Sequence, residues 1–155
     1  MRWSDYLATL PAAEQMRLVN WLTLGFGQLN LAVRLGTQNV PVGAVLGALA
    51  AAADLLHGSR MLLPGMATAA PVESTLIVPV VGWQPFLLGL AMADRAALLD
   101  GLTQVVQQAR QAGELLLTDQ VVTAVAAQLA HVAAGLADSR QYLLSLVRRY
   151  AATAD

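Results

Sequence analysis

The sequence predicts an all-α fold, a single-domain helical bundle of about five helices that spans residues 1–155 as one helical domain. Three observations predict it. The length of 155 residues fits one ordinary domain. Apolar residues recur at helical spacing in most segments. Only Thr75 to Val81, TLIVPVV, is rich in β-branched residues, and Pro79 in its middle lacks the N–H that a central strand would donate. A lone extended segment cannot make a sheet, so helices remain.

The first long helix is expected after a short opening turn with Ser4 as a candidate cap. It starts at Thr9-Leu10-Pro11, since proline suits a first helical turn and Glu14 then lies at the positive end of the helix dipole. Its apolar side recurs every three or four residues: Leu18, Leu22, Phe26 and Leu29.

A second helix is predicted to be capped by Asn39, to begin with Pro41 and to end near His57, because Gly58 is a typical residue just past a helix end. The following segment, GSRMLLPGMATAAPVE (58–73), has two prolines, two glycines and little periodicity. It is therefore the predicted connector.

Three further helices are expected in the second half. Asp94 is the expected cap of one that ends at Gly113, and Thr118 the cap of the next. A new start at Asp138 or Ser139 begins the last helix. No repeat is found at the period of a solenoid. The middle one of these helices carries the spacing of a packed seam: Val122, Val125, Leu129, Val132 and Leu136.

The stretch STLIVPVVGWQPFLLGLAMA (74–93) has no charge and is long enough to cross a bilayer. Pro79 and Pro85 interrupt its middle, and no cluster of basic residues flanks it, so a membrane span is not expected. It should instead run extended and irregular near 74–84, break at Trp83, and turn helical from Pro85 through Leu90.

The same stretch is expected to lie against protein. Trp83, with Phe86 and Leu87, should pack into the bundle or a partner chain, with the indole N–H of Trp83 finding a partner. These three residues are therefore interface candidates.

Composition excludes several chemistries. The chain has no cysteine, so disulfides and thiolate chemistry are absent. It has no lysine either, which excludes a Schiff base. The net charge is −1 and the charges are spread along the chain, whereas nucleic-acid binding needs a basic field on one face. The first residues do not resemble a secretory signal, so the expected location is cytoplasmic.

Weak site motifs do not add up to a catalytic or metal site. Asp54 and His57 share a helix face, but a bundle metal site needs a second such pair, and His131 has no matching carboxylate. GFGQLN (25–30) lacks the third glycine of a dinucleotide loop. No metal, no cofactor and no catalytic residue is predicted.

A row of small residues is the sharpest remaining feature. Gly43, Gly47 and Ala51 stand four apart, and rows of this kind let another helix backbone approach closely. A tight crossing inside the domain, an interface between chains and a slot for a flat apolar ligand are all compatible with it. A parallel row, Ala44, Ala48 and Ala52, runs beside it, and a later helix carries Ala124, Ala127, Ala130 and Ala134.

These observations favour a non-enzymatic helical module that oligomerises or docks on a larger protein partner through apolar helix faces. The interface candidates are Gly43, Gly47, Ala51, Trp83, Phe86 and Leu87. The alternative is a carrier of an apolar small ligand in a slot between helices, lined by Trp21, Phe26, Trp83 and Phe86. Peripheral membrane attachment through residues 74–93 is the third hypothesis.

Overall fold

The computed structural model describes residues 1–38, 40–61, 63 and 81–153. Within these residues the chain forms helices and no strands, so the all-α prediction is confirmed. The helices are α1 (Trp3–Thr9), α2 (Ala12–Leu35), α3 (Val42–Met61), α4 (Trp83–Leu88), α5 (Met92–Leu117) and α6 (Val122–Thr153).

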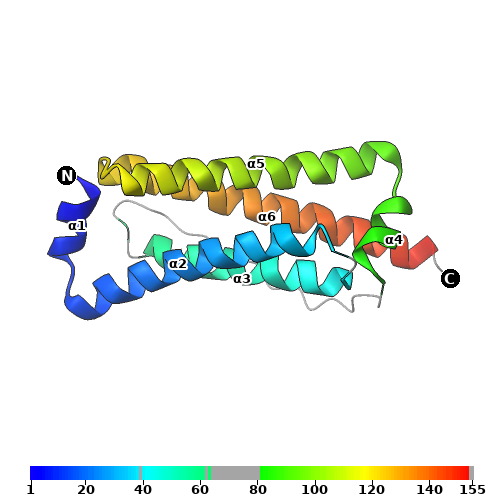
Figure 1. The fold of residues 1–155 in the computed structure, drawn as a ribbon, viewed down its shortest axis with the longest axis horizontal. Helices are drawn as coiled ribbons and strands as arrows, with labels where there is room; N and C mark the ends of the chain where they lie inside the picture. The colour runs from blue at the N-terminus through cyan, green and yellow to red at the C-terminus, as the bar shows by residue number, and fades with distance from the viewer. Residues whose placement is uncertain (39, 62, 64–80, 154–155) are drawn as a thin grey trace.

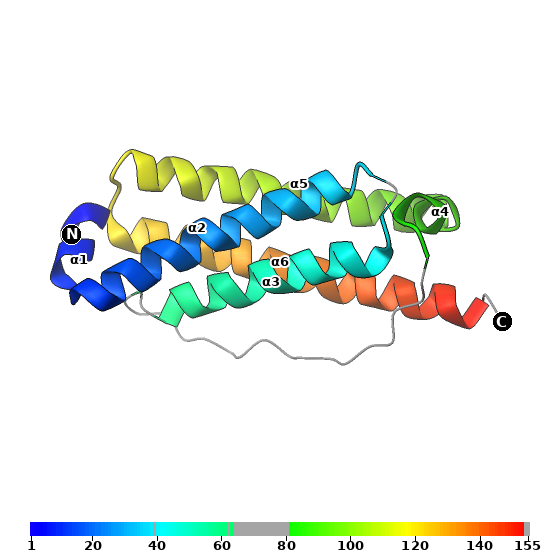
Figure 2. The same ribbon diagram turned by 60° about the horizontal axis from the view of Figure 1, so that its bottom comes forward.

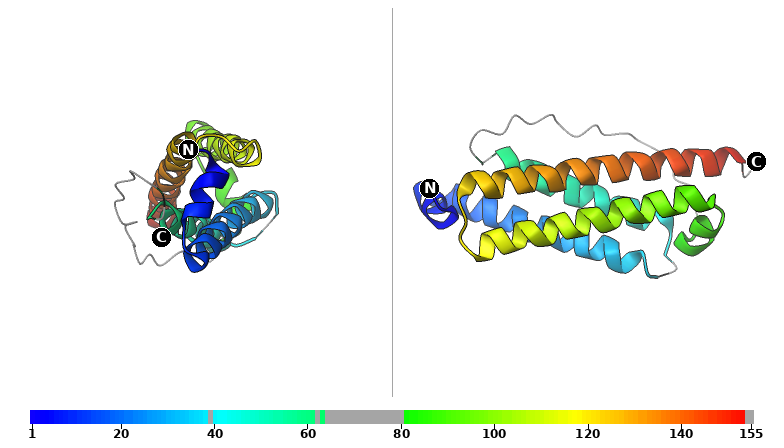
Figure 3. Two further views of the ribbon diagram at one scale, coloured as in Figure 1. Left: turned by 90° about the vertical axis from the view of Figure 1, so that its left-hand side faces the viewer. Right: turned by 90° about the horizontal axis from the view of Figure 1, so that it is seen from above.

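The four long helices, α2, α3, α5 and α6, run side by side as a bundle (Figure 1). The closely packed neighbours are α2 with α3, α3 with α6, and α5 with α6. The remaining side, between α2 and α5, is much less closely packed. The view along the bundle in Figure 3 shows this square arrangement, with α1 lying across one end. Figure 2 shows α4 at the opposite end.

The two halves of the chain are built alike. The order short helix, long helix, long helix occurs in α1–α3 and again in α4–α6, and the sequences align without a gap when residues eighty positions apart are paired. The identical pairs that are buried in both halves are Trp3 and Trp83, Leu18 and Leu98, Ala32 and Ala112, Val42 and Val122, Val45 and Val125, Leu49 and Leu129, Leu56 and Leu136, Ser59 and Ser139, and Leu63 and Leu143.

Backbone contacts follow the same repeat. Trp3 N donates to Gln120 O at 2.8 Å, and Trp83 N donates to Val40 O at 2.6 Å. Each short helix is thus fixed to the loop between the long helices of the other half, so the halves hold each other at both ends of the bundle. This repeat of eighty residues is longer than the period of a solenoid, for which the sequence predicted no repeat.

The starts of the first helices differ in part from expectation. Pro11 is the residue directly before α2, close to the predicted start. Ser4, the predicted cap, instead lies inside α1, which begins after Arg2. Its hydroxyl and its backbone N–H donate to the two carboxylate oxygens of Asp119, at 2.7 and 2.8 Å. These hydrogen bonds lower the pKa of Asp119, because they favour its charged form.

Further predicted helix boundaries are wrong. Asp94, the predicted cap, lies in the first turn of α5, because that helix begins at Met92 after Ala91. At the other boundaries, tertiary packing extends the helices beyond the predicted ends. α3 continues past Gly58 to Met61, and α5 continues past Gly113 to Leu117. Thr118 follows α5 rather than capping α6. α6 does not restart at Asp138 or Ser139. A helical glycine costs only about 1 kcal/mol relative to alanine, which the burial of long apolar faces exceeds. Asn39 and residues 62 and 64–73 of the predicted connector lie outside the described residues.

The break at Trp83 within the uncharged stretch is confirmed, since α4 begins there. The helix starts two residues before Pro85, which sits in its first turn, where its missing N–H has no intrahelical acceptor to lose. Residues 74–80 of this stretch lie outside the described residues. No helix in the described part of the chain has both the length and the apolarity to cross a membrane.

Candidate functional site

The α4 end of the bundle is anchored by aromatic side chains. Trp83, Phe86 and Leu87 are all buried within this chain, so they pack into the bundle, the first of the two neighbours expected for them. The rings of Trp83 and Phe86 lie 5.9 Å apart, and Phe86 meets Tyr150 edge-on at 5.5 Å. Phe86 is fully buried next to Trp83 and anchors α4 to the bundle. The indole of Trp83 extends from this anchored helix.

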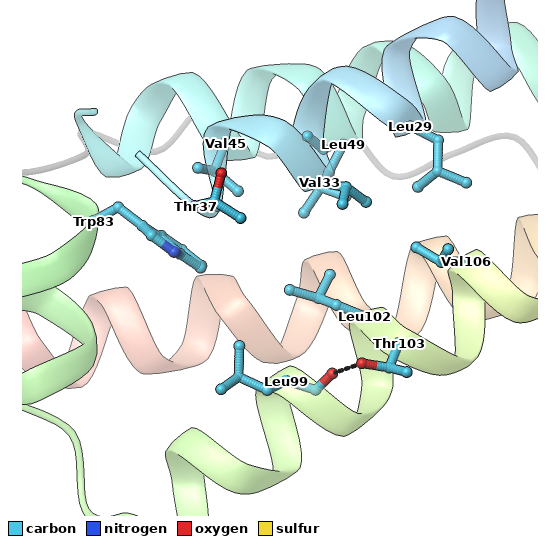
Figure 4. Close-up of a pocket in the computed structure, with 12 residues that line it drawn as sticks. Leu29, Val33, Thr37, Val45, Leu49, Trp83, Leu99, Leu102, Thr103 and Val106 are labelled. Carbon is cyan, nitrogen blue, oxygen red and sulfur yellow. Dashed lines mark hydrogen bonds between the residues drawn. The ribbon is translucent and has the colours of Figure 1, made fainter. Parts of the chain in front are cut away.

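An apolar cleft of about 340 Å³ opens beside this indole, on the loosely packed side between α2 and α5. Figure 4 shows the ring of Trp83 extending from α4 into the space between these two helices. The residues that line the cleft are Leu29, Ala32, Val33, Gly36, Thr37, Val45, Leu49, Trp83, Leu99, Leu102, Thr103 and Val106.

The lining side chains carry no charge and few polar atoms. Thr37 donates its hydroxyl hydrogen to Arg34 O at 2.7 Å, and Thr103 donates to Leu99 O at 2.8 Å. Both hydroxyl hydrogens are therefore already donated to nearby backbone carbonyl oxygens. The cleft resembles ligand sites of small apolar molecules, which are concave, mostly hydrophobic and typically about 300–1,000 Å³ in volume.

Unlike the two threonine hydroxyls, the indole N–H of Trp83 has no hydrogen-bond partner among the described residues. Trp83 is 1% exposed, and its Nε1 is buried with no hydrogen-bond partner among the described residues. The expectation that this N–H finds a partner within the fold is therefore wrong. A buried donor without an acceptor typically costs about 1–3 kcal/mol. An acceptor that reached this N–H would therefore remove an unfavourable contribution to the free energy.

Only one residue of the predicted slot lines the cleft, namely Trp83. Trp21 instead stacks against Arg17, whose guanidinium lies 5.7 Å from the ring centre. Phe26 is half-buried on α2, and Phe86 lies in the core behind Trp83. The sequence reasoning missed Gly36 and Val106, because it did not foresee that α2 and α5 face each other across the open side of the bundle.

The small-residue row does not form a tight crossing within the domain. Gly43 and Gly47 are exposed, and a Cβ added at Gly47 would meet no described atom within 4 Å. Ala48 and Ala52, from the parallel row, are the buried small residues of α3. The interpretation of an intramolecular contact at Gly47 is therefore wrong, whereas the role of Gly43, Gly47 and Ala51 as interface candidates stays a prediction. In α6 the small residues Ala124, Ala127 and Ala134 are exposed as well.

Among the described residues, no three histidine or acidic side chains gather in a way that could hold a metal ion. Asp54 is exposed and His57 half-buried on α3, and no further potential ligand joins them. The cleft therefore stands as the candidate site with the most defined geometry in the described part of the chain.

Comparisons with protein-family models, with curated proteins and with solved structures found no match to this chain.

Proposed function

We propose that this protein is a non-enzymatic helical module that binds a neutral, apolar small ligand in the cleft between α2 and α5. The observation that carries the proposal is the cleft itself, about 340 Å³ of apolar space on the open side of the bundle, with a buried tryptophan at its end. The absence of charged side chains from its lining favours a neutral ligand, because an ion would lose its hydration there without compensation.

The internal repeat supports this assignment. The position equivalent to Val106 in the other half is Phe26, and the position equivalent to Gly36 is Leu116. A phenylalanine is thus compatible with this backbone at the place where the cleft has a valine. The smaller residues, Gly36 and Val106, line the cleft at the α4 end of the bundle together with Trp83.

Val106→Phe tests the proposal by placing the side chain of the other half into the cleft. We expect wild-type protein to bind 2-ethylnaphthalene saturably, and Val106→Phe to weaken that binding at least about tenfold by occupying the space. Titration calorimetry measures both. Val19→Phe is the matched control, because Val19 is an exposed valine of α2 that does not line the cleft.

Two outcomes of this experiment would contradict the proposal. Wild-type protein that binds no apolar probe would contradict the ligand function itself. Equal affinity in wild type and Val106→Phe would place the probe elsewhere on the protein.

Docking on a protein partner, or self-association, is the second candidate. Val19 and Leu99 occupy equivalent positions of the repeat, and both are 42% exposed. Large apolar side chains exposed on α2 and α5 favour an interaction surface there. The mass of the purified protein in solution, measured by light scattering with and without the bound probe, separates the candidates. A probe-independent oligomer supports assembly, and a monomer that binds the probe supports the ligand function.

A further inference from the structure

We infer that the ligand of the α2/α5 cleft carries a hydrogen-bond acceptor, such as a carbonyl or ether oxygen, that receives the indole N–H of Trp83. The inference rests on the proposed function and adds the chemical class of the ligand. The expected ligand has an apolar body and one neutral acceptor, and the acceptor lies at the end of the ligand that is nearest α4.

The first argument is the unmet donor. Trp83 Nε1 is buried and donates to no described protein group, although the indole borders the cleft. The hydroxyls of Thr37 and Thr103 already donate to backbone carbonyls. Among the polar side chains that line the cleft, the indole therefore holds the one N–H or O–H hydrogen for which an incoming ligand can supply the acceptor.

The second argument is the residue beside that donor. Gly36 follows the end of α2 with φ −65° and ψ −17°, an ordinary helical conformation that does not require glycine. A Cβ added there would lie 3.7 Å from Trp83 Nε1, and 3.4 Å or more from the nearest backbone oxygens, which is ordinary contact. Neither the backbone nor packing excludes alanine at this position. Glycine instead leaves the space next to the indole nitrogen empty.

The third argument is the position of the indole at the wall of the cleft. Trp83 and Gly36 both line the cleft, and Figure 4 shows the ring extending into the space between α2 and α5. Nε1 is buried, so the ring has to shift slightly beside Gly36 before an acceptor reaches the N–H. An acceptor would stabilise the shifted ring, because it satisfies a donor that is otherwise unpaired.

A matched pair of neutral probes tests the inference. 2-Acetylnaphthalene and 2-ethylnaphthalene have similar shapes, but only the first has a carbonyl oxygen. In wild type, the acetyl compound should bind about three- to tenfold more tightly than the ethyl compound, the range that one neutral hydrogen bond supplies. Gly36→Ala should reduce this preference, taken as the ratio of the two affinities in the same variant, to about one, because the added methyl group occupies the space next to Nε1.

Indole N–H resonances give a readout that does not depend on affinity. The chain has three tryptophans, and Trp83→Phe identifies the Trp83 signal in a ¹⁵N-labelled sample by its loss. The acetyl probe should move this signal downfield, as a newly formed hydrogen bond does, and the ethyl probe should not. Trp3→Phe, at the equivalent position of the other half, is the matched control and should leave both probe responses intact.

The outcomes separate the two proposals. A carbonyl preference in wild type that Gly36→Ala abolishes, with the Trp83 shift, supports the inference. Equal binding of both probes without that shift overturns it and leaves the ligand function standing. Binding of neither probe overturns the proposed function, and the inference with it.

Discussion

The two ends of the α2/α5 side share one backbone design but differ in side-chain volume. At the α4 end, Gly36 and Val106 leave a cleft in front of Trp83. At the α1 end, the equivalent positions hold Leu116 and Phe26, both of which pack against the core. The difference shows that a cleft here depends on a few changes of side-chain volume within a repeated backbone arrangement, and requires no new element of secondary structure.

The helix crossings show the same principle with the sizes exchanged. Where α2 crosses α3, Gly25 faces α3, and a Cβ added to it would lie 3.1 Å from Leu56 Cδ2 and 3.5 Å from Leu55 Cβ. The equivalent crossing of α5 and α6 pairs Val105 with Gly135, whose added Cβ would lie 3.0 Å from Val105 Cγ2. Residues 25 and 105 are repeat partners, as are 55 and 135. Each crossing thus places one small residue against one larger residue, with the order reversed.

The largest effect is expected from the two repeat-related tryptophans. Trp83→Ala should destabilise the fold by about 3–5 kcal/mol, the usual cost of deleting a buried aromatic ring. Trp3→Ala should cost less, because Trp3 is 8% exposed and its aromatic neighbour, Tyr6, is only half-buried. Urea unfolding followed by far-UV circular dichroism measures both. Equal losses would mean that the ends are equally well enclosed.

Gly135→Ala should have an intermediate effect. The new methyl group would stand 3.0 Å from Val105 Cγ2 and from Gln108 Oε1, and overpacking of this kind costs about 1–3 kcal/mol. Combining it with Val105→Ala should cost less than the sum of the single variants, because the second change makes room for the first. Additive losses in urea unfolding would contradict the size exchange between the two crossings.

The smallest effect is expected at helical glycines where an added Cβ would contact no described atom. Gly47→Ala and Gly113→Ala should stabilise the protein by about 0.5–1 kcal/mol, since no described atom lies within 4 Å of the added Cβ and alanine is the better helix former. Thermal unfolding measures this gain.

Gly47→Leu then sharpens the remaining interface prediction. It should melt close to the parent, so that a change in the mass of the particle in solution would report an interface between chains at Gly47. A large loss of stability in the isolated protein would instead show that the α3 face is packed within the fold.

The helical class was predictable from the sequence, because the apolar spacing of α2, α5 and α6 is local and strong. The break at Trp83 was predictable as well, since two prolines disfavour a continuous helix through the uncharged stretch. The helix itself, Trp83–Leu88, begins and ends two residues earlier than the predicted turn from Pro85 through Leu90. The repeat is also a property of the sequence alone: pairing Trp3 with Trp83 aligns the remaining pairs without a gap. A self-comparison over distances longer than a solenoid period would have found it.

Tertiary structure alone decided the helix ends and the cleft. Gly58, Gly113 and Ser139 are weak local stop or start signals, and burial of the long helix faces overrides them. The periodicity of a helix shows which face is apolar but not which helix covers it. The open side between α2 and α5, and with it the unpaired N–H of Trp83, therefore follows only from how four apolar faces share one core.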